Sequence, residues 1–387
     1  MSAPDLLRCA LPTAPQPALA DALSRPALAY AVQDALAVAR ARPAYATPTL
    51  AAWFRENRRL GSKERPAVAD GVYGVIRHEA LLTRAGATTD LARVEALLGL
   101  LRGDRFPGLT SEGPEADYAT ALSLPGVLAS EWLRALGPDE AAALGGALGG
   151  RAPLVVRANR ARADRAALAA RLAAEGVVSA PCVGAPDGLV LSGRIQMTSL
   201  VSYREGWFEV QDEASQRFVE ALVPHLERDD RVLDLCAGAG GKALALASRG
   251  ARVRAWDVRG DALDELLRRA GRAGVGERIR VGPPRPAPLV VVDAPCSSSG
   301  RLRRDPALRW GLDPTRHRAA QAALLAQAAA LVLPGGVLAW ATCSLFAAEN
   351  EVQPPDPVRW DLLEQCVLWP HRDGTDGFAW RIWRYLG

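Results

Sequence analysis

The last part of the chain, from about residue 212 onward, alternates between short apolar runs and longer amphipathic runs. Short apolar runs bounded by turn residues are typical of buried strands, whereas apolar positions repeated every three or four residues are typical of helices. The alternating segments are 213–223, 231–236, 242–250, 252–257, 261–273, 289–293, 315–333 and 337–342. Strands and helices in this order predict a parallel sheet that is covered by helices on both faces.

Two other regions precede the alternating part. Residues 1–145 carry apolar positions at helical spacing, broken by Pro, Gly and Asp, so we expect an all-helical domain that binds a partner. We interpret His78 and its neighbouring arginines as a solvated helix face. Residues 146–211 contain a strand, a helix ending at Gly176 and further strand-like runs, which predicts a small α+β module. A third domain, 212–387, contains the alternating part.

The composition is that of a globular protein, which we expect to be cytoplasmic. Hydrophobic residues make up 49% of the chain and charged residues 23%, and no uncharged apolar run is long enough to span a membrane. The first residues do not resemble a secretion signal. Six cysteines are scattered without a C-x-x-C pair, so we expect reduced thiols, no zinc or other metal and no disulfide framework.

The basic residues are nearly all arginine. The net charge is +4, and Lys63 and Lys242 are the only lysines among 47 basic residues. Arginine makes bidentate contacts with phosphates, so a polyanionic partner fits this composition without being required by it.

A glycine-rich turn, VLDLCAGAGGK at 232–242, joins the first strand of the alternating part to its helix. It lacks the Walker A pattern, because no Ser or Thr follows Lys242. Such a turn lets backbone N–H groups approach a ligand, and the next strand leads to Asp257, whose carboxylate can accept hydrogen bonds from ribose hydroxyls. We therefore expect a nucleotide-like cofactor here, with Cys236 as a packing residue and not a nucleophile.

Two cysteines directly follow two other strands. Cys296 ends the run LVVVDAPC at 289–296, and Cys343 lies in VLAWATCS at 337–344. A thiol at the carboxyl end of a sheet strand is placed for covalent chemistry on a bound ligand. Asp293 adds a carboxylate to the first loop, which continues into Arg301, Arg303 and Arg304. The pattern favours a two-thiol catalytic site over buried thiols beside a basic surface loop.

The ordered motifs DLCAGAGGK, AWDV, VVVDAPCSSSGRLRRDP and ATCSLFAAENE resemble those of the RsmB/Sun/Fmu family of RNA cytosine-5 methyltransferases. The segment GWFEVQDEASQ at 206–216 is similar to the one that precedes the methyltransferase domain in that family, and DGTDGFAWRIW at 373–383 to its closing hairpin. Residues 54–77 are similar to the helical NusB-like domain of the RsmB branch. The resemblance implies a class I Rossmann-like methyltransferase domain preceded by a NusB-like domain and a small α+β module.

The resemblance also implies a mechanism and its residues. The Cys343 thiolate would add to C6 of the cytosine, so that C5 attacks the methyl group of S-adenosyl-L-methionine, while Cys296 helps to remove the C5 proton or release the adduct. Asp293 would hydrogen-bond the base. The cofactor would be held by Cys236, Ala237, Gly238, Ala239, Gly240, Gly241, Lys242, Asp257 and Asp293, and RNA phosphates by Arg301, Arg303 and Arg304.

The sequence departs from the family pattern at three places. Ala239 stands where the family usually has Pro, and Pro283, in a shortened 281–288 segment, stands where an acidic residue contacts the adenine side of the cofactor. Prolines follow Glu351 where a longer helix is usual. The second departure predicts weaker cofactor binding, or an adenine held by the backbone alone.

Three functions remain open from the sequence. The first is methylation of a structured rRNA, expected to be the 16S rRNA of the small subunit or its precursor, by a monomer. The second is a DNA cytosine-5 methyltransferase, in which Cys296 would be the nucleophile. The third is a non-catalytic rRNA-binding assembly factor that keeps the fold, which the altered adenine-side segment favours.

Overall fold

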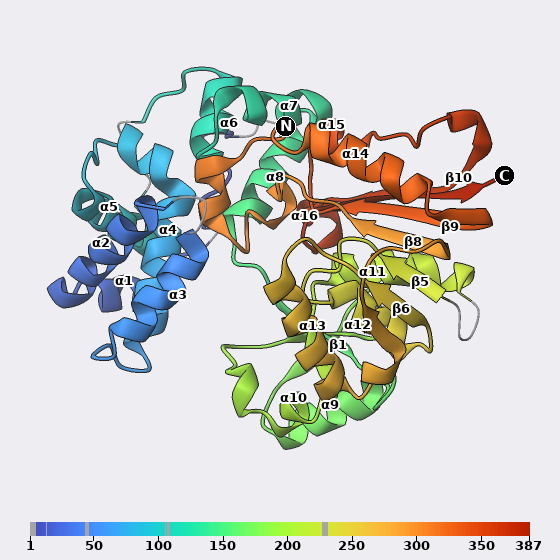
Figure 1. Ribbon diagram of the computed structural model, residues 1–387. Coiled ribbons are helices and arrows are strands. Elements are labelled where there is room, and N and C mark those ends of the chain that lie inside the picture. The colour runs from blue at the N-terminus through green and yellow to red at the C-terminus, as the bar shows by residue number, and fades with distance from the viewer. Residues whose placement is uncertain (1–4, 13, 43–45, 105, 107–108, 227–230) are drawn as a thin grey trace. The chain divides into compact units, whose positions relative to one another are not determined.

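The computed structural model describes residues 5–387 apart from 13, 43–45, 105, 107–108 and 227–230 (Figure 1). The chain forms two compact units. The first contains the chain up to Ala152 with Ser298–Asp313 and Pro370–Gly374, and the second contains Pro153–Ser297, Pro314–Trp369 and Thr375–Gly387. The division into three domains stays a prediction. Among the described residues, no helix is both long and apolar enough to cross a lipid bilayer.

The N-terminal part of the first unit is helical, as the sequence predicted. Apolar residues on one side of α2, α4 and α5, such as Val32, Val72 and Leu97, are buried in a common core. Helix α5 begins at the N-cap Thr89, whose hydroxyl accepts the Ala92 N–H at 3.2 Å. The helices are α1 (Pro17–Leu23), α2 (Pro26–Arg40), α3 (Ala46–Glu56), α4 (Glu64–Arg84), α5 (Asp90–Arg102), α6 (Pro114–Leu122), α7 (Gly126–Leu136) and α8 (Pro138–Gly149).

The interpretation of His78 as part of a solvated face is wrong. Its side chain is only 3% exposed, and burial, together with nearby Arg77 and Arg309, lowers its pKa to about 3. The helical period identifies the faces of α4 but not the residues that will cover them. Here the covering residues include part of the distant 298–313 segment, since Arg77 donates to the Arg303 carbonyl at 3.1 Å.

The 298–313 segment is held in the first unit by a buried arginine. Arg309 is 4% exposed, and its guanidinium donates to the carbonyl oxygens of Leu122 (2.8 Å), Leu302 (3.0 Å) and Leu148 (3.3 Å). Buried carbonyl groups need such donors, so Arg309 stabilises two helix ends and its own loop together. No local sequence pattern indicates this role.

The second unit begins with a small module whose four strands form an antiparallel sheet in the order β2-β3-β1-β4. Helix α9 begins at Asp164, which accepts the Ala167 N–H at 2.8 Å, and is followed by Gly176 with a positive φ of 77°. The predicted α+β composition is therefore present. The elements are β1 (Leu154–Ala158), α9 (Arg165–Ala174), β2 (Ser179–Pro181), β3 (Gly188–Leu191), α10 (Val201–Arg204) and β4 (Phe208–Val210).

A seven-stranded sheet in the order β10-β11-β9-β8-β5-β6-β7 forms the centre of the second unit. Strands β9, β8, β5, β6 and β7 are parallel, whereas β11 pairs antiparallel with both β9 and β10. The four strands predicted from the pattern, β5, β6, β8 and β9, are parallel as expected, whereas β7 extends the parallel part and β10 and β11 add an antiparallel pair at one edge. The strands are β5 (Arg231–Asp234), β6 (Arg252–Ala255), β7 (Ile279–Val281), β8 (Ala287–Asp293), β9 (Val332–Thr342), β10 (Trp360–Leu368) and β11 (Phe378–Tyr385).

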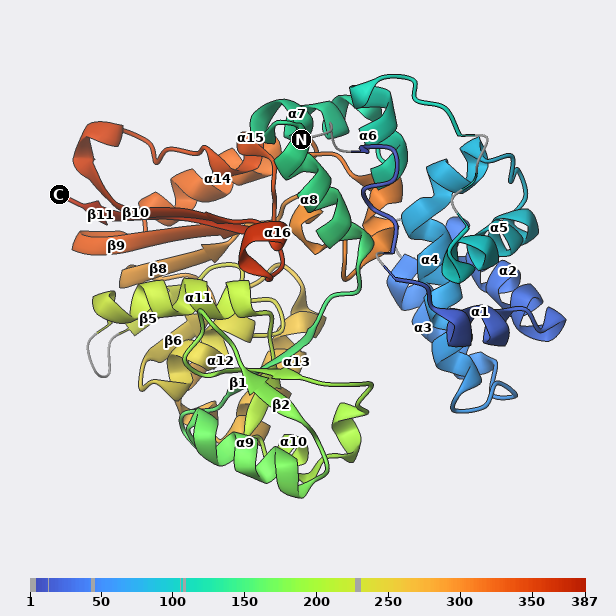
Figure 2. The same ribbon diagram turned by 180° about the vertical axis from the view of Figure 1, so that it is seen from behind.

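Helices cover both faces of this sheet (Figures 1 and 2). On one face, Phe218, Leu244 and Leu266 pack against Val232 and Val291. On the other face, Leu325 packs with strand residues in a second core. The helices are α11 (Glu213–Leu222), α12 (Gly241–Ser248) and α13 (Gly260–Ala273) on the first face, α14 (Arg318–Ala329) on the second, and the short α15 (Ala347–Asn350) and α16 (Pro370–Asp373).

Candidate active site

The order of the parallel strands brings four loops to one edge of the sheet. In this register Asp234 of β5 pairs with Ala255 of β6 and Val291 of β8, and Asp293 of β8 pairs with Ala341 of β9. The glycine turn, the Asp257 loop and the two cysteine loops all leave the carboxyl ends of these strands. Ligands of doubly wound sheets bind at this edge.

The glycine turn adopts backbone conformations that a side chain would disturb. Gly238 and Gly240 have positive φ values of 50° and 87°, and a Cβ on Gly240 would lie 2.7 Å from Leu266 Cγ. The turn therefore packs directly on α13 and leads into the first turn of α12. Residues 236–241 of the predicted cofactor loop occupy this turn, and Cys236, Gly238, Ala239 and Gly241 are partly exposed.

Asp257 lies beside the glycine turn, as expected for a ribose-binding acid. Its Oδ2 accepts the Gly238 N–H at 2.8 Å, and its Oδ1 accepts the Arg259 N–H at 2.9 Å. Burial alone would raise the pKa of Asp257, but hydrogen bonds from Arg259 and Gly238 lower it below its usual value. Asp257 is therefore a carboxylate that is fixed against the turn.

Lys242, the last residue of the glycine motif, points toward the end of β8. Its Nζ lies 2.6 Å from Asp293 Oδ2 and 5.1 Å and 5.9 Å from the ring centroids of Phe378 and Phe218. The Lys242 side chain is 8% exposed and that of Asp293 is 37% exposed. This ion pair with cation–π contacts fixes the Asp293 carboxylate while leaving part of it accessible.

Asp234 belongs to this site although we did not predict it. The residue is 1% exposed, and neither carboxylate oxygen has a hydrogen-bond partner of normal geometry within the described residues. Burial is the main cause that raises its pKa to about 7, and Lys242 and the Cys236 N–H offset only part of this. A buried acid at the mouth of a glycine turn was visible in the sequence as the D of DLCAGAGGK.

The two cysteine loops place their thiols side by side. The Sγ atoms of Cys296 and Cys343 are 3.5 Å apart, and both side chains are partly exposed. By contrast, burial raises the pKa values of Cys9, Cys182 and Cys236 to about 12. A high pKa leaves little thiolate, so these three residues are poor nucleophiles, in agreement with the interpretation of Cys236 as a packing residue.

The three arginines after Cys296 have different environments and belong to the first unit. Arg301 is exposed and Arg304 is partly exposed. Arg303 is only 6% exposed, and its guanidinium donates to the Gly374 carbonyl at 2.8 Å. This burial does not fit the RNA phosphate contact expected of Arg303. A buried guanidinium that is hydrogen-bonded to a carbonyl cannot reach the phosphates of an RNA bound at the surface. Arg301 and Arg304 remain candidates.

The small module supports the glycine turn through a buried acid. Glu209 of β4 is 3% exposed and accepts hydrogen bonds from Arg269 (2.7 Å) and Arg272 (2.5 Å) of α13. Arg269 also donates to the Ala239 carbonyl at 2.7 Å. The module thereby fixes α13 and the turn that leaves β5, a contribution that the sequence did not indicate.

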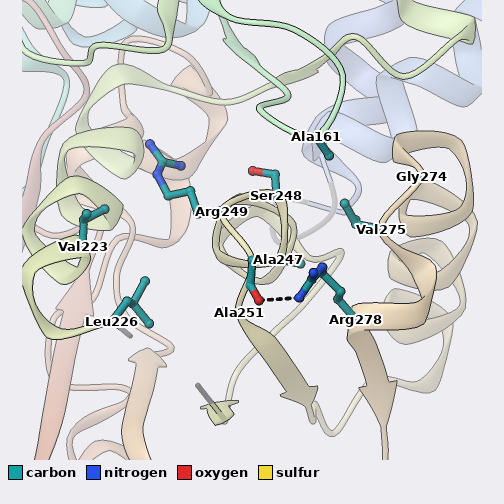
Figure 3. A pocket seen from close by; sticks show the side chains of 11 residues that line it. Ala161, Val223, Leu226, Ala247, Ser248, Arg249, Ala251, Gly274, Val275 and Arg278 are labelled. Atoms are coloured by element: carbon teal, nitrogen blue, oxygen red, sulfur yellow. Dashed lines mark hydrogen bonds between the residues drawn. The ribbon is translucent and has the colours of Figure 1, made fainter. Parts of the chain in front are cut away.

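A cavity of about 530 Å³ in the second unit is lined by residues that include Gly250, Ala251 and Arg278 (Figure 3). Gly250 and Ala251, which line it, directly precede β6, so the cavity is at the amino ends of the parallel strands. Its arginines have protein partners, since Arg278 donates to the Gly250 carbonyl at 2.5 Å and Arg249 pairs with Asp187 at 2.7 Å. It is not the expected cofactor site, which is at the opposite edge.

The residues at the carboxyl edge fit S-adenosylmethionine. The glycine turn offers backbone N–H groups, and Asp257 offers a carboxylate for the ribose hydroxyls. Asp234 is a buried acid whose oxygens have no hydrogen-bond partner of normal geometry among the described residues, which suits a ligand that carries ammonium and sulfonium charges. After β7 the Gly282 N–H donates to the Ala255 carbonyl at 3.2 Å, and Pro283 follows at the position where the family resemblance implied an acid on the adenine side.

The sheet, its flanking helices and its glycine turn define a Rossmann-like methyltransferase fold. The same fold is found in the methyltransferase homolog protein from Pyrococcus horikoshii, with a TM-score of 0.60 and 22% identity over 71% of this chain and 100% of that one. This likeness concerns the fold alone.

Comparisons with models of protein families indicate which kind of methyltransferase the chain is similar to. Residues 221–380 match the family described as 16S rRNA methyltransferase RsmB/F, and residues 124–198 match the ferredoxin-like domain of RsmF/B-like methyltransferases. The chain is therefore similar to RsmB/F methyltransferases, in agreement with the resemblance of its motifs. The second match begins in the loop before α7, upstream of the module boundary expected at 146.

Curated relatives carry the same family name. The probable ribosomal RNA small subunit methyltransferase B of Synechocystis sp. is 32% identical over 262 residues, which are 58% of each chain. The ribosomal RNA small subunit methyltransferase B of Citrobacter koseri is 33% identical over 218 residues, 52% of this chain and 50% of that protein. The chain thus matches between half and three-fifths of the length of these relatives.

Proposed function

We propose that this protein transfers a methyl group from S-adenosylmethionine to C5 of a cytosine in the rRNA of the small ribosomal subunit. The observation that supports this most directly is the pair of thiols 3.5 Å apart at the edge that carries the glycine turn. The similarity of residues 221–380 to the 16S rRNA methyltransferase RsmB/F family and the names of the curated relatives support the substrate class.

The reaction requires a nucleophile that adds to the cytosine ring and a base that later removes a proton from the same ring. Carbon C5 of cytosine becomes nucleophilic when a thiolate adds to C6, and we assign this addition to Cys343 Sγ. Bound S-adenosylmethionine supplies the electrophilic methyl group. Cys296, whose sulfur lies beside that of Cys343, then helps to take the C5 proton, after which the Sγ–C6 bond breaks and the methylated base leaves.

Asp293 and Lys242 stabilise the base during this cycle. Lys242 binds Asp293 Oδ2 at 2.6 Å, so the other carboxylate oxygen of this half-exposed residue can accept a hydrogen bond from the amino group of the cytosine. An acceptor fixed before the reaction stabilises charge without reorganising. Lys242 is therefore assigned to orienting Asp293.

The RNA side of the proposal rests on the other parts of the chain. The target base must leave its stack to reach the thiols, and sequence-specific RNA enzymes act on bases that are splayed from loops. We assign docking of a structured rRNA to the helical domain, guidance of the strand to the small module, and phosphate contacts to Arg301 and Arg304. We propose that the protein carries out this function in the cytoplasm as a monomer.

The test separates the roles of the thiols. Cys343→Ala should abolish 5-methylcytosine formation on rRNA, and Cys296→Ala should accumulate a denaturation-resistant protein–RNA adduct that disappears in the double variant. Cys366→Ala is the matched control and should keep full activity. Full activity of Cys343→Ala would contradict the nucleophile assignment. Absence of an adduct with Cys296→Ala, combined with an active Cys343→Ala enzyme, would favour the DNA-type arrangement.

One observation supports a second candidate function, a non-catalytic assembly factor. The adenine-side segment after β7 carries Pro283 where the family has an acid. Calorimetry with S-adenosylmethionine distinguishes the two functions, because the assembly factor would not bind it at millimolar concentration. Bisulfite sequencing of rRNA from a deletion strain and its parent would identify the methylated cytosine.

A further inference from the structure

Two adjacent residues of α15 each reach one of the cysteine loops. The first contact concerns Cys343, whose two neighbours in sequence are both bound by Asn350. Asn350 Oδ1 accepts the Thr342 hydroxyl at 2.5 Å, and Asn350 Nδ2 donates to the Ser344 carbonyl at 3.0 Å. One amide therefore spans the residue that carries the proposed nucleophile and fixes the backbone on both sides of it.

The loop that carries Cys296 is held in the same manner by two residues. Glu349 Oε1 accepts the Ser297 N–H at 2.8 Å, and Glu349 Oε2 accepts the Ser297 hydroxyl at 2.5 Å. On the other side of the thiol, Gln321 Nε2 of α14 donates to the Pro295 carbonyl at 2.8 Å and lies 3.5 Å from Glu349 Oε1. Helices α14 and α15 lie side by side on the same face of the sheet (Figures 1 and 2).

A purely structural explanation does not account well for Glu349. Its side chain is 0% exposed, and a buried carboxylate is costly unless it is fully hydrogen-bonded. An apolar residue at this position would stabilise the fold at lower cost, as replacements of buried charged groups have shown elsewhere. Local turn bonds already order the Cys343 loop, since the Phe346 N–H donates to Ser344 Oγ at 3.0 Å. The hydrogen bonds of Glu349 are instead directed at the residue that follows Cys296.

We propose that Glu349, with Gln321, and Asn350 are positioning residues that hold the two thiols in register for the transfer and release steps. Because they are adjacent, Glu349 and Asn350 couple the two loops through a single short helix. Their effect on catalysis rests on the proposed function, whereas their effect on the distance between the thiols does not. Asn350 controls Cys343, and Glu349 and Gln321 control Cys296.

The distance between the thiols can be measured without any methylation assay. Diamide takes two electrons and two protons from a pair of adjacent thiols, which yields a disulfide and a hydrazine. The rate at which a Cys296–Cys343 cross-linked peptide appears in mass spectra reports how closely the two thiols are held together. Glu349→Ala should slow this rate about tenfold, since two hydrogen bonds to the loop are lost. Glu349→Gln should restore most of it, because its amide can accept the Ser297 N–H and donate to the Ser297 hydroxyl.

The exposed neighbour Glu351 provides the matched control, and Glu351→Ala should cross-link at the rate of the unmodified protein. In methylation assays Glu349→Ala should accumulate the protein–RNA adduct, as Cys296→Ala does, whereas Asn350→Ala should slow its formation. A general loss of folding would slow formation of the adduct and its release equally. If Glu349→Ala does not fold, Gln321→Ala must slow cross-linking instead.

Cross-linking of Glu349→Ala and Gln321→Ala at the unmodified rate would overturn the positioning role. Slower cross-linking in these variants, with no 5-methylcytosine made by the unmodified protein, would keep the positioning role and refute the proposed function.

Discussion

The carboxyl group of Asp234 provides a quantitative test of the electrostatics at the carboxyl edge of the sheet. Asp234→Asn keeps the size of the side chain and removes its titration. Burial raises the pKa of Asp234 from 3.8 to about 7, so the folded protein holds this proton over a pH range in which the unfolded chain releases it. Below pH 4 both states are protonated, and the group does not affect the pH dependence of stability.

As the pH rises from about 4 to 7, the unfolded state loses the proton first, and stability falls by about 1.4 kcal/mol per pH unit. Above pH 7 both states are ionised, and the loss reaches a plateau of at most about 4 kcal/mol. The Asp234→Asn variant does not lose stability in this way, because its side chain does not titrate. Its stability relative to the unmodified protein should therefore increase by about 2–3 kcal/mol between pH 5 and pH 8.

The assay is urea denaturation of both proteins at pH 5 and pH 8, followed by tryptophan fluorescence and, in parallel, thermal melts. At each pH the melting temperature of the variant is compared with that of the unmodified protein. The difference, variant minus unmodified, should be about 5–10 °C larger at pH 8 than at pH 5. Any constant offset from the amide cancels, because only the change with pH is compared. A stability difference that is equal at the two pH values would refute the buried ionisation of Asp234.

Three further predictions concern His78, Asp257 and Arg309. Because the pKa of His78 is lowered from 6.5 to about 3, protonation of the unfolded chain should cost the first unit about 2 kcal/mol between pH 7 and pH 5, and His78→Leu should remove this loss in denaturation curves. Asp257→Asn should weaken S-adenosylmethionine binding about 10- to 100-fold in calorimetry, since a charged acceptor is lost; unchanged affinity would exclude it from the ribose site. Arg309→Leu leaves three buried carbonyls without their donor and should lower the unfolding free energy by about 3–5 kcal/mol, whereas a loss below 1 kcal/mol would mean that water replaces the guanidinium.

Local patterns were sufficient for most elements of the alternating part and for the location of the site. The apolar runs around Val232 and Val291 predicted buried strands, and the residues that end them, with Cys296 and Cys343, were predicted to meet at one edge. That prediction depended only on the parallel order of the strands, because parallel neighbours bring all their carboxyl ends together. The 3.5 Å distance between the thiols agrees with it.

Other features depended on partners that are far away in sequence. The edge strand β10 follows a proline-rich segment whose pattern did not predict a strand, and only the family resemblance of 373–383, not the local pattern, implied the closing hairpin that includes β11. The family resemblance implied that Arg303 contacts RNA phosphates, yet the residue is buried against Gly374. A charged residue gives the same local signal whether it contacts solvent or a carbonyl, so its burial could not be read from its neighbours in the chain.

The sequence by itself determined the resemblance to the RsmB/Sun/Fmu family, the Rossmann-like sheet, the glycine turn and the two thiol-bearing loops, since each of these is encoded by consecutive residues and by the short-range sterics of strands, helices and turns. Only the tertiary structure decided the pKa values of Asp234 and His78, the pairing of Lys242 with Asp293 and the contacts of Glu349 and Asn350 with the cysteine loops. These properties depend on desolvation and on hydrogen bonds, and both arise only when segments that are distant in the chain pack together.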